Sequence, residues 1–434
     1  MVGERNDPVL LSSLCVLINR GVAPAYTNDG GVLVLNQRCI RDGRINWALA
    51  RYTDPAQKSL PHNKLLKPFD ILVNSTGVGT LGRVAQIGVF DLQATVDSHV
   101  TIVRPDASRV DPVYLGLVLR DRQADIEALA EGSTGQTELS RFSLGALAVS
   151  LPPVPVQRVV ASLLGSLDDK IELNQRIVAT LEEMTQALFK SWFVDFDPVH
   201  AKAEGRDPVL PADTAALFPD RFGDDGLPEG WRRETLRPSL AQLVTRGITP
   251  TYADEGLAVI NQKCIRNRRV DFALARWHDT TSRRVPDAKL LQAGDIVINS
   301  TGAGTLGRVA QVRQLGVEAT VDTHVTIVRP SRDAAWSNYL GLQLISREDQ
   351  IEQLGQGSTG QTELSRDAVA SLSVVVPSDR VLDAFSDVTA PLLSHLDAAL
   401  SESAVLRELR DTLLPKLISG ELHIKDAEAA VEAA

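Results

Sequence analysis

The chain has 434 residues, 44% of them hydrophobic, and a formal net charge of −10. This length allows more than one hydrophobic core, and the negative charge argues against nonspecific coating of nucleic acid while leaving local contacts open. Cys15, Cys39 and Cys264 form neither a disulfide framework nor a CxxC zinc motif. Because the apolar stretch Val9 to Ile18 is too short to span a bilayer, we expect a cytoplasmic protein without membrane contact.

One domain-sized segment occurs twice in the chain. Asn74 to Gln86 reappears as Asn299 to Gln311 with a single difference, and Gly132 to Arg141 reappears unchanged as Gly357 to Arg366. Both shifts are 225 residues (299−74 and 357−132), so the repeat is far longer than the unit of a solenoid. Hydroxyls, amides, glycines and arginines were kept along with the apolar framework, which suggests that one ligand is bound twice.

Each copy begins with short strands and continues into a helix. In the first copy, Val32 to Leu35, Asp70 to Val73 and Val100 to Val103 are β-branched segments bounded by turn-forming residues. Tyr114 to Leu129 has the apolar spacing of a helix. We therefore predict an α+β domain in each copy.

A long amphipathic helix is expected after each domain. From Val160 to Trp192 apolar residues alternate in steps of four and three, the pattern of a coiled-coil seam, and Asn174 is a polar position suited to fixing the register. Leu392 to Leu417 carries a second, less regular leucine stripe. The two helices should pack antiparallel, which gives the single chain an approximate two-fold axis.

The predicted organisation has six parts. They are a first domain at 1–155, a long helix at 156–194, a connector at 195–230, a second domain at 231–380, a second long helix at 381–422 and a frayed tail at 423–434. The connector should be ordered because Phe196, Phe218 and Phe222 give it side chains to bury.

Two polar loops in each copy are candidate ligand contacts. The glycine-rich loop can bring backbone N–H groups and hydroxyls close to a phosphate. In the second loop, Gln136 suits bidentate pairing with adenine, and nearby arginines suit phosphate or guanine. The candidates are Arg20, Arg41, Asn74, Ser75, Thr76, Arg83, Ser133, Thr134, Gln136 and Arg141 in the first copy, and Arg246, Arg266, Asn299, Ser300, Thr301, Arg308, Ser358, Thr359, Gln361 and Arg366 in the second.

The same residues have structural alternatives. The glycine-rich loop can be a tight turn that needs positive φ, the second loop can be a helix N-cap formed by Thr137 with Ser140, and each arginine can be a solvated surface charge. His99 and His324 are expected to be packed, hydrogen-bonded structural residues rather than ligands or bases.

Five segments carry a resemblance to a known family. They are Leu167 to Val199 (LDDKIELNQRI…SWFVDFDPV), LPEGW at Leu227 to Trp231, the two STGQTELS loops, and LRDTLLPKLISGEL at Leu409 to Leu422. With its order of domain, helix, domain, helix, the chain resembles the specificity subunits of type I restriction-modification systems over nearly its whole length. The resemblance implies two target-recognition domains joined by conserved spacer helices.

The resemblance also implies a function and partners. Such a subunit has no active site; it recognises a bipartite target in double-stranded DNA. It holds two modification subunits, which bind S-adenosylmethionine and methylate adenine N6, and restriction subunits, which use ATP and Mg. This chain agrees in having no GxxxxGK[ST] loop and no amino-methyltransferase motif, so no cofactor or metal is expected on it. The alternative is a duplicated anion-binding or protein-binding scaffold without sequence-specific DNA recognition.

Two expectations about the target follow. About 30 helical residues at about 1.5 Å each span about 45 Å, so the long helices are predicted to set the distance between two half-sites. Because identical side chains in identical loops favour the same bases, the target is predicted to be an interrupted palindrome or to differ from one at a base or two.

Overall fold

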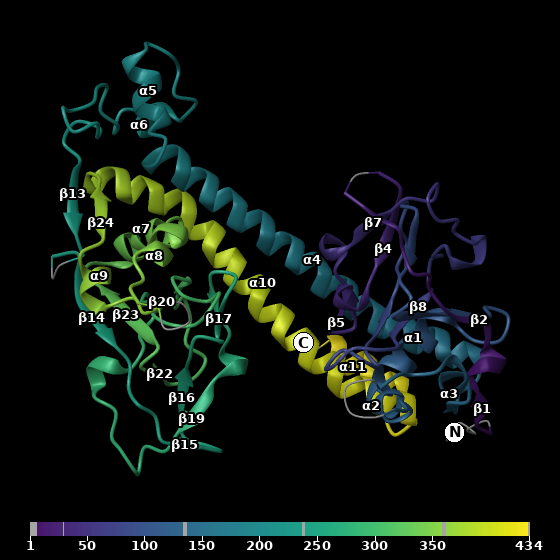
Figure 1. Ribbon diagram of the computed structural model, residues 1–434. Coiled ribbons are helices and arrows are strands. Elements are labelled where there is room, and N and C mark those ends of the chain that lie inside the picture. Colours follow the sequence, from purple (N-terminus) through teal and green to yellow (C-terminus); the bar gives the residue numbers. More distant parts are fainter. Residues whose placement is uncertain (1–6, 29, 133–136, 237–238, 358–361, 433–434) are drawn as a thin grey trace. The chain divides into compact units, whose positions relative to one another are not determined.

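The computed structural model describes residues 7–28, 30–132, 137–236, 239–357 and 362–432. The chain divides into two compact units, Met1–Gln175 with Ser401–Ala434, and Arg176–Leu400. Each unit contains one strand-rich domain together with parts of both long helices, α4 (Val154–Phe193) and α10 (Asp379–Ser419), as Figure 1 shows. The predicted α+β class, with two similar domains and two long helices, is confirmed.

The domain of the first unit is built on two four-stranded sheets. The sheet with the longer strands, which we call the larger sheet, is antiparallel throughout. Its order is β2 (Cys15–Arg20), β11 (Val100–Pro105), β8 (Ile71–Asn74), β9 (Val84–Gln86). The smaller sheet has the order β10 (Ala94–Val96), β4 (Val32–Leu35), β7 (Arg51–Thr53), β3 (Tyr26–Thr27), with β10 parallel to β4. Two short pairs complete the strands: β1 (Val9–Leu10) with β12 (Ala148–Val149), and β5 (Ile40–Arg41) with β6 (Arg44–Ile45).

Strand alternation explains the layers of this domain. Successive side chains point to opposite faces of a sheet, so Ile71 and Val73 of β8 face one core with helix α1 (Pro112–Asp121), while Leu72 faces a second core with the smaller sheet. The helix predicted at Tyr114–Leu129 is interrupted at Arg122 and continues as α2 (Gln123–Ala128). Helix α3 (Arg141–Gly145) follows, with the side chain of Ser140 as its N-cap.

The second unit repeats this arrangement. Its larger sheet has the order β14 (Ala241–Arg246), β23 (Val325–Pro330), β20 (Ile296–Asn299), β21 (Val309–Gln311). Its smaller sheet has the order β15 (Tyr252–Ala253), β19 (Arg276–His278), β16 (Leu257–Ile260), β22 (Ala319–Val321). The remaining elements are the pairs β17 (Ile265–Arg266) with β18 (Arg269–Val270) and β13 (Arg232–Thr235) with β24 (Ser373–Val376), and helices α7 (Ala334–Ile345), α8 (Glu348–Gln353) and α9 (Arg366–Ala370).

The long helices pack antiparallel within each unit. In the first unit Asp168 of α4 pairs with Arg410 of α10, and further along α4 the amide of Asn174 donates to Glu402 over 2.7 Å. Because the residue number on α10 decreases as the residue number on α4 increases, the two helices run in opposite directions. Asn174 is only 1% exposed, so this buried polar contact has the register-fixing position that the sequence predicted. In the second unit Val178 and Leu181 pack with Leu396 and Ala399.

The ends of the long helices are covered by further helices. After α4, the connector forms α5 (Asp197–Ala203) and α6 (Ala212–Ala215), and its Phe218 is buried against Trp192 with the two rings at 88°. After α10, the segment expected to fray instead forms α11 (Ile424–Glu432), because Ala427 is fully buried and Ile424 and Val431 pack on the same core. Among the described residues, no helix is both long and apolar enough to cross a membrane.

Candidate nucleic-acid interface

At one end of the larger sheet in each unit, three loops are held together by backbone hydrogen bonds. In the first unit the N–H of Ser75 donates to His99 O, and the N–H of Leu139 donates to Ser75 O, both over 2.8 Å. In the second unit Ser300 and Leu364 make the same two bonds over the same distance. We call this region the polar end: residues 74–80, 97–99 and 137–139 in the first unit, and 299–305, 322–324 and 362–364 in the second.

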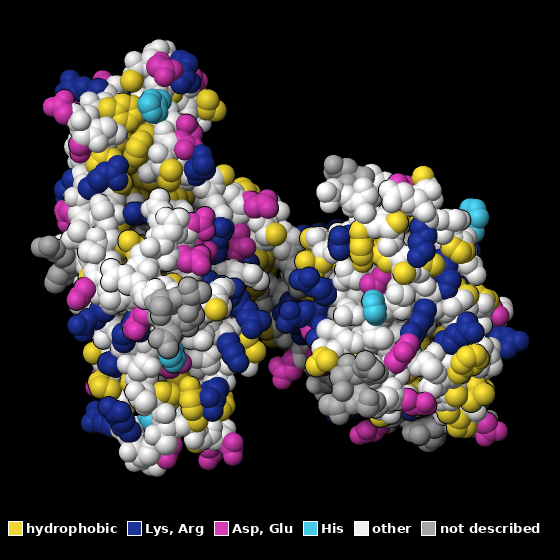
Figure 2. Space-filling view, in the orientation of Figure 1, with side chains coloured by type: hydrophobic (Ala, Val, Ile, Leu, Met, Phe, Trp, Pro, Cys, Tyr) yellow, Lys and Arg dark blue, Asp and Glu magenta, His cyan; other side chains and the backbone are white. Residues whose placement is uncertain are grey.

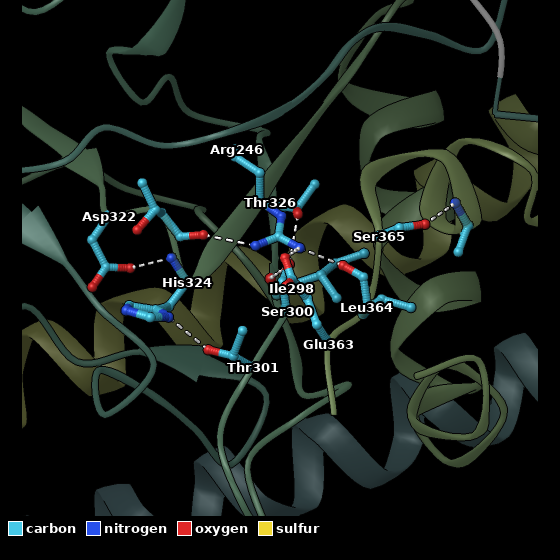
Figure 3. Close-up of polar contacts among 12 residues, drawn as sticks. Arg246, Ile298, Ser300, Thr301, Asp322, His324, Thr326, Glu363, Leu364 and Ser365 are labelled. Atoms are coloured by element: carbon cyan, nitrogen blue, oxygen red, sulfur yellow. Dashed lines mark hydrogen bonds and ion pairs between the residues drawn. The ribbon is translucent and has the colours of Figure 1, made fainter. Parts of the chain in front are cut away.

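One arginine in each unit ties these loops together. Figure 3 shows the guanidinium of Arg246 donating to the carbonyl of Thr323 over 2.8 Å and to that of Leu364 over 2.6 Å, and pairing with Glu363 over 2.7 Å. Arg20 donates to Leu139 O over 2.7 Å and pairs with Glu138. The side chains are 27% exposed for Arg20 and 21% for Arg246, so both are mainly engaged within the domain.

The amide and the first hydroxyl of each glycine-rich loop are buried. Asn74 and Ser75 have no exposed surface, and neither have Asn299 and Ser300. The Asn74 amide donates to Gln37 O and Thr80 O over 3.0 Å, and the Ser75 hydroxyl lies 2.6 Å from that of Thr101. In this conformation their side chains shape the loop from inside.

Glycine in this loop serves the backbone conformation. Gly77 has φ 109° and Gly79 has φ 71°, values that favour glycine. A Cβ at Gly77 would lie 2.2 Å from the Thr80 hydroxyl, whereas a Cβ at Gly79 would meet nothing within 4 Å. The structure therefore has the tight positive-φ turn that was the alternative explanation for these glycines, and its tip remains open to solvent, with Val78 92% exposed.

A half-buried threonine and an exposed histidine of the polar end lie next to a half-buried glutamine, Gln37, from an earlier loop. Thr76 Oγ1 lies 2.8 Å from His99 Nδ1 and donates to Gln37 Oε1 over 3.4 Å. His99 is hydrogen bonded as expected, but the prediction that it is packed is wrong, because the loop connection places its ring in solvent. His324 is exposed in the same way. Sequence reasoning missed Gln37, although its repeat in NQRCIR and NQKCIR was a visible signal.

The other predicted contacts are distributed around the domains. Arg41 and Arg266 are exposed on the short hairpins, while Arg83 and Arg308 turn back to the carbonyls of Gly79 and Gly304 over 2.7 and 2.8 Å. Two further exposed candidates start α3 and α9: Arg141 and Arg366. The N-cap of α3 is Ser140, not Thr137. Six candidates lie outside the described residues: Ser133, Thr134, Gln136, Ser358, Thr359 and Gln361.

A second repeated surface feature joins an arginine to an aromatic ring. The Arg51 guanidinium lies 3.6 Å from the centre of the Tyr26 ring, and that of Arg276 lies 3.2 Å from the centre of Tyr252. Tyr26 is 38% exposed and Tyr252 is 39% exposed; burial of the rest of each side chain raises its pKa above the ordinary value, with a further contribution from a nearby aspartate. A guanidinium stacked on an aromatic ring can still donate from its edge to an anion such as phosphate.

Charge alone does not delimit an interface. On the face drawn in Figure 2, Lys and Arg side chains are spread over both units with acidic side chains among them. The repeated geometry is therefore more informative: the polar end and the arginine–tyrosine stack occur in both units with nearly equal distances.

Proteins of known type resemble this chain in sequence. No family model matches the chain. It is, however, 25% identical over 413 residues to the type I restriction enzyme HindI specificity subunit of Haemophilus influenzae, covering 84% of this chain and 89% of that protein. This chain is a homologue of type I specificity subunits. The MjaIX specificity subunit of Methanocaldococcus jannaschii is 23% identical over 308 residues, covering 69% of this chain and 67% of that one.

A solved specificity subunit has the same fold. The crystal structure of the type I restriction-modification system S subunit from M. genitalium aligns with a TM-score of 0.60 and 16% sequence identity, covering 95% of this chain and 96% of that one. The resemblance to type I specificity subunits seen in the sequence is thereby confirmed.

Proposed function

We propose that this chain is the DNA-sequence specificity subunit of a type I restriction-modification complex, recognising a bipartite DNA target with one domain per half-site. The observation that carries the proposal is the repeated polar end, which presents the same side chains twice on homologous domains. Homology over 89% of the HindI specificity subunit supports the role. The chain itself is noncatalytic, and it acts on DNA in the cytoplasm.

Within this function the predicted contact residues have two roles. The buried Asn74, Ser75, Asn299 and Ser300 position the loop. The exposed arginines and the arginine–tyrosine stacks contact phosphates, because guanidinium groups bind phosphate oxygens with good geometry. Exposed polar groups at the polar end contact base edges, and the second polar loops contribute Gln136 and Gln361.

The long helices are proposed to be the scaffold for catalytic partners. Two modification subunits, which bring S-adenosylmethionine, contact the helices and the connector, and restriction subunits bring ATP and Mg. The support is the sequence resemblance, which is densest at Leu167–Val199 and Leu409–Leu422. These segments have no predicted part in sequence recognition.

The target sequence is the most direct test. Because the contact loops of the two domains are nearly identical, we predict an interrupted palindrome, or a sequence one or two bases from it. Single-molecule mapping of methylated adenines in the host, repeated in a strain that lacks this chain, would identify the motif. Unrelated half-sites would contradict the equivalence of the two domains.

A binding assay separates this function from the alternative scaffold. Gel-shift titration of the chain with its modification subunits should show a preference for the mapped duplex over a scrambled one of at least about a thousand-fold, as is usual for specific DNA-binding proteins. Equal binding of both duplexes would instead favour an anion-binding or protein-binding scaffold.

A further inference from the structure

The least explained feature of the polar end is a chain of three hydrogen-bonded side chains that occurs in both units. In the first unit it runs from Gln37 through Thr76 to His99, and in the second from Gln262 through Thr301 to His324. The threonine–histidine distance is 2.8 Å in both, and the threonine–glutamine distance is 3.4 and 3.3 Å. Figure 3 shows the ring of His324 directed at the Thr301 hydroxyl.

The threonine hydroxyl engages one nitrogen of each histidine. Thr76 Oγ1 lies 2.8 Å from His99 Nδ1, and the 3.4 Å contact with Gln37 Oε1 gives the single hydroxyl proton of Thr76 a second acceptor. In the arrangement in which Thr76 donates to Gln37, Nδ1 of His99 carries the ring proton and Nε2 of the neutral ring is a hydrogen-bond acceptor. Thr301, His324 and Gln262 have the same contacts.

Buried groups hold these three hydrogen-bonded side chains in place. The N–H of His99 donates to the carboxylate of Asp97 over 2.8 Å, and Asp97 is only 5% exposed. The buried Asn74 amide binds the carbonyl of Gln37. A Cβ at Gly77 would lie 3.0 Å from Gln37 Nε2, so the glycine leaves room for that amide. The backbone of the exposed histidine and that of the glutamine are thus both hydrogen bonded to buried side chains, Asp97 and Asn74.

We propose that His99 and His324 are base-contacting residues, one for each half-site, and that Gln37, Thr76, Gln262 and Thr301 are positioning residues for them. In the major groove an acceptor pairs with an exocyclic amino group, which is N6 of adenine or N4 of cytosine. This assignment rests on the proposed function. It extends that function by naming the chemical group recognised and by giving the two histidines the same specificity.

The experiment uses duplexes in which single amino groups are deleted. With the full chain in complex with its modification subunits, each adenine of the mapped target is replaced by purine, and each cytosine by 2-pyrimidinone. Loss of a single hydrogen bond corresponds to a decrease in affinity of about three- to ten-fold. At one position in each half-site, His99→Ala or His324→Ala should remove the decrease that the unmodified complex shows. Whether this position is an adenine or a cytosine identifies the base.

Thr76→Val and Thr301→Val test the positioning role. Valine has nearly the shape of threonine but no hydroxyl, so the histidine ring loses its orientation while the chain stays folded. Thr76→Val should weaken discrimination at the first half-site only and Thr301→Val at the second only, so each variant controls for the other. Thr76→Ser keeps the hydroxyl and should restore discrimination.

Three results would overturn the proposal, and they are distinguishable. If His99→Ala and His324→Ala show the same decreases as the unmodified complex at every amino-deleted position, neither histidine contacts an amino group of a base. If they weaken binding to every duplex equally and lower the salt dependence by about one phosphate, the histidines contact the backbone. If the unmodified complex shows no preference for any duplex, the proposed function itself fails.

Discussion

At the residue scale, one buried ion pair stabilises each domain. Arg104 donates to both carboxylate oxygens of Asp70 over 2.7 Å, and Arg329 contacts Asp295 over 2.8 and 2.7 Å. Asp70 has no exposed surface and Asp295 has 1%. Since each carboxylate also accepts a backbone N–H, from Lys67 or Gln292, these pairs connect the end of a strand to the preceding turn.

Removal of the carboxylate should therefore be costly. We expect Asp70→Ala or Asp295→Ala to lower the free energy of unfolding by about 3–5 kcal/mol, because a largely buried guanidinium is left without its counter-charge. Urea unfolding monitored by circular dichroism measures the change. The matched control is Asp125→Ala, whose carboxylate is 55% exposed in its pair with Arg122 and should contribute no more than about 1 kcal/mol. Equal effects of the buried and exposed variants would contradict this account.

The three cysteines should be unreactive in the folded chain. Burial raises the pKa of Cys15 to about 12, with a smaller contribution from Asp106, and burial also raises the pKa of Cys39 and Cys264. Only the thiolate is nucleophilic, so at pH 8 iodoacetamide should label the urea-unfolded chain three times and the folded chain very slowly, as measured by mass spectrometry.

The same pKa shift has a consequence for stability. The folded chain holds these thiol protons more tightly than the unfolded chain, in which the pKa of cysteine is about 8.5. The contribution of the thiols to stability is therefore complete below about pH 8.5 and decreases as the pH rises above that value, for Cys15 up to about pH 12. Rapid labelling of folded protein at pH 8 would be incompatible with these shifts.

Residue roles could be predicted from the sequence only in part. The repeat identified Asn74 and Thr76 as candidate contacts in one polar loop because both copies kept them, whereas His99, which both copies also kept, was predicted to be a packed structural residue. It could not separate the buried Asn74 from the exposed His99, since a residue that shapes a loop and a residue that contacts a ligand are both retained. Burial depends on contacts such as Leu139 with Ser75, between segments far apart in the sequence.

At the element scale, the long helices carry apolar side chains that the antiparallel seam does not use. Leu173 on α4 is 51% exposed and Val405 on α10 is 48% exposed. Single exposed apolar residues are common on protein surfaces, but Leu173 lies within Leu167–Val199 and Val405 lies on the helix that carries most of Leu409–Leu422, the segments in which the family resemblance is densest. These positions are therefore our candidates for contact with the modification subunits.

A charge at these positions should prevent assembly. We expect Leu173→Asp and Val405→Asp to abolish co-purification of tagged modification subunits while the helical circular dichroism signal is retained. Arg158→Glu, at an exposed position on α4, changes the charge without removing apolar surface and should leave co-purification intact. Full methyltransferase recovered with both aspartate variants would place the contact elsewhere.

Elements differed in how well the sequence predicted them. The coiled-coil spacing predicted that α4 and α10 exist and pair, because every residue needed for that inference lies in one continuous stripe. The smaller sheets were not predictable in this way. Strand β3 has two residues, and β4 lies between β7 and a parallel strand almost 60 residues on, so their pairing depends on long-range contacts. The short α11 was not predicted because terminal residues commonly fray, and the burial of Ala427 depends on contacts with segments far away in the sequence.

At the scale of the whole molecule, the equivalent positions of α4 and α10 make the helices suitable for setting the spacing of the half-sites. Both helices begin at equivalent positions, Val154 and Asp379, 225 residues apart (379−154). Removal of one heptad from each at equivalent positions keeps the seam on the same face. It shortens each helix by about 10.5 Å, or about three base pairs of duplex DNA.

Methylation-site sequencing of such a variant gives the result directly. The spacer between the half-sites should be about three base pairs shorter and the half-site bases unchanged. Insertion of one heptad in each helix is the matched control and should lengthen the spacer by the same amount. A variant with altered half-site bases would show that the helices take part in base recognition.

The long helices are also expected to couple the unfolding of the main hydrophobic cores of the two units. Neither α4 nor α10 is broken where one compact unit gives way to the other, at Gln175/Arg176 and Leu400/Ser401. If one core melts, the surviving core is left with helix ends that have lost their antiparallel partner, and isolated helix segments are marginal in water. Heating should therefore produce one calorimetric transition rather than two, and a substitution in one domain should lower the melting temperature of the other. Such a chain should retain or lose recognition of both DNA half-sites together. A partly unfolded subunit that recognises a single half-site is therefore not expected to accumulate.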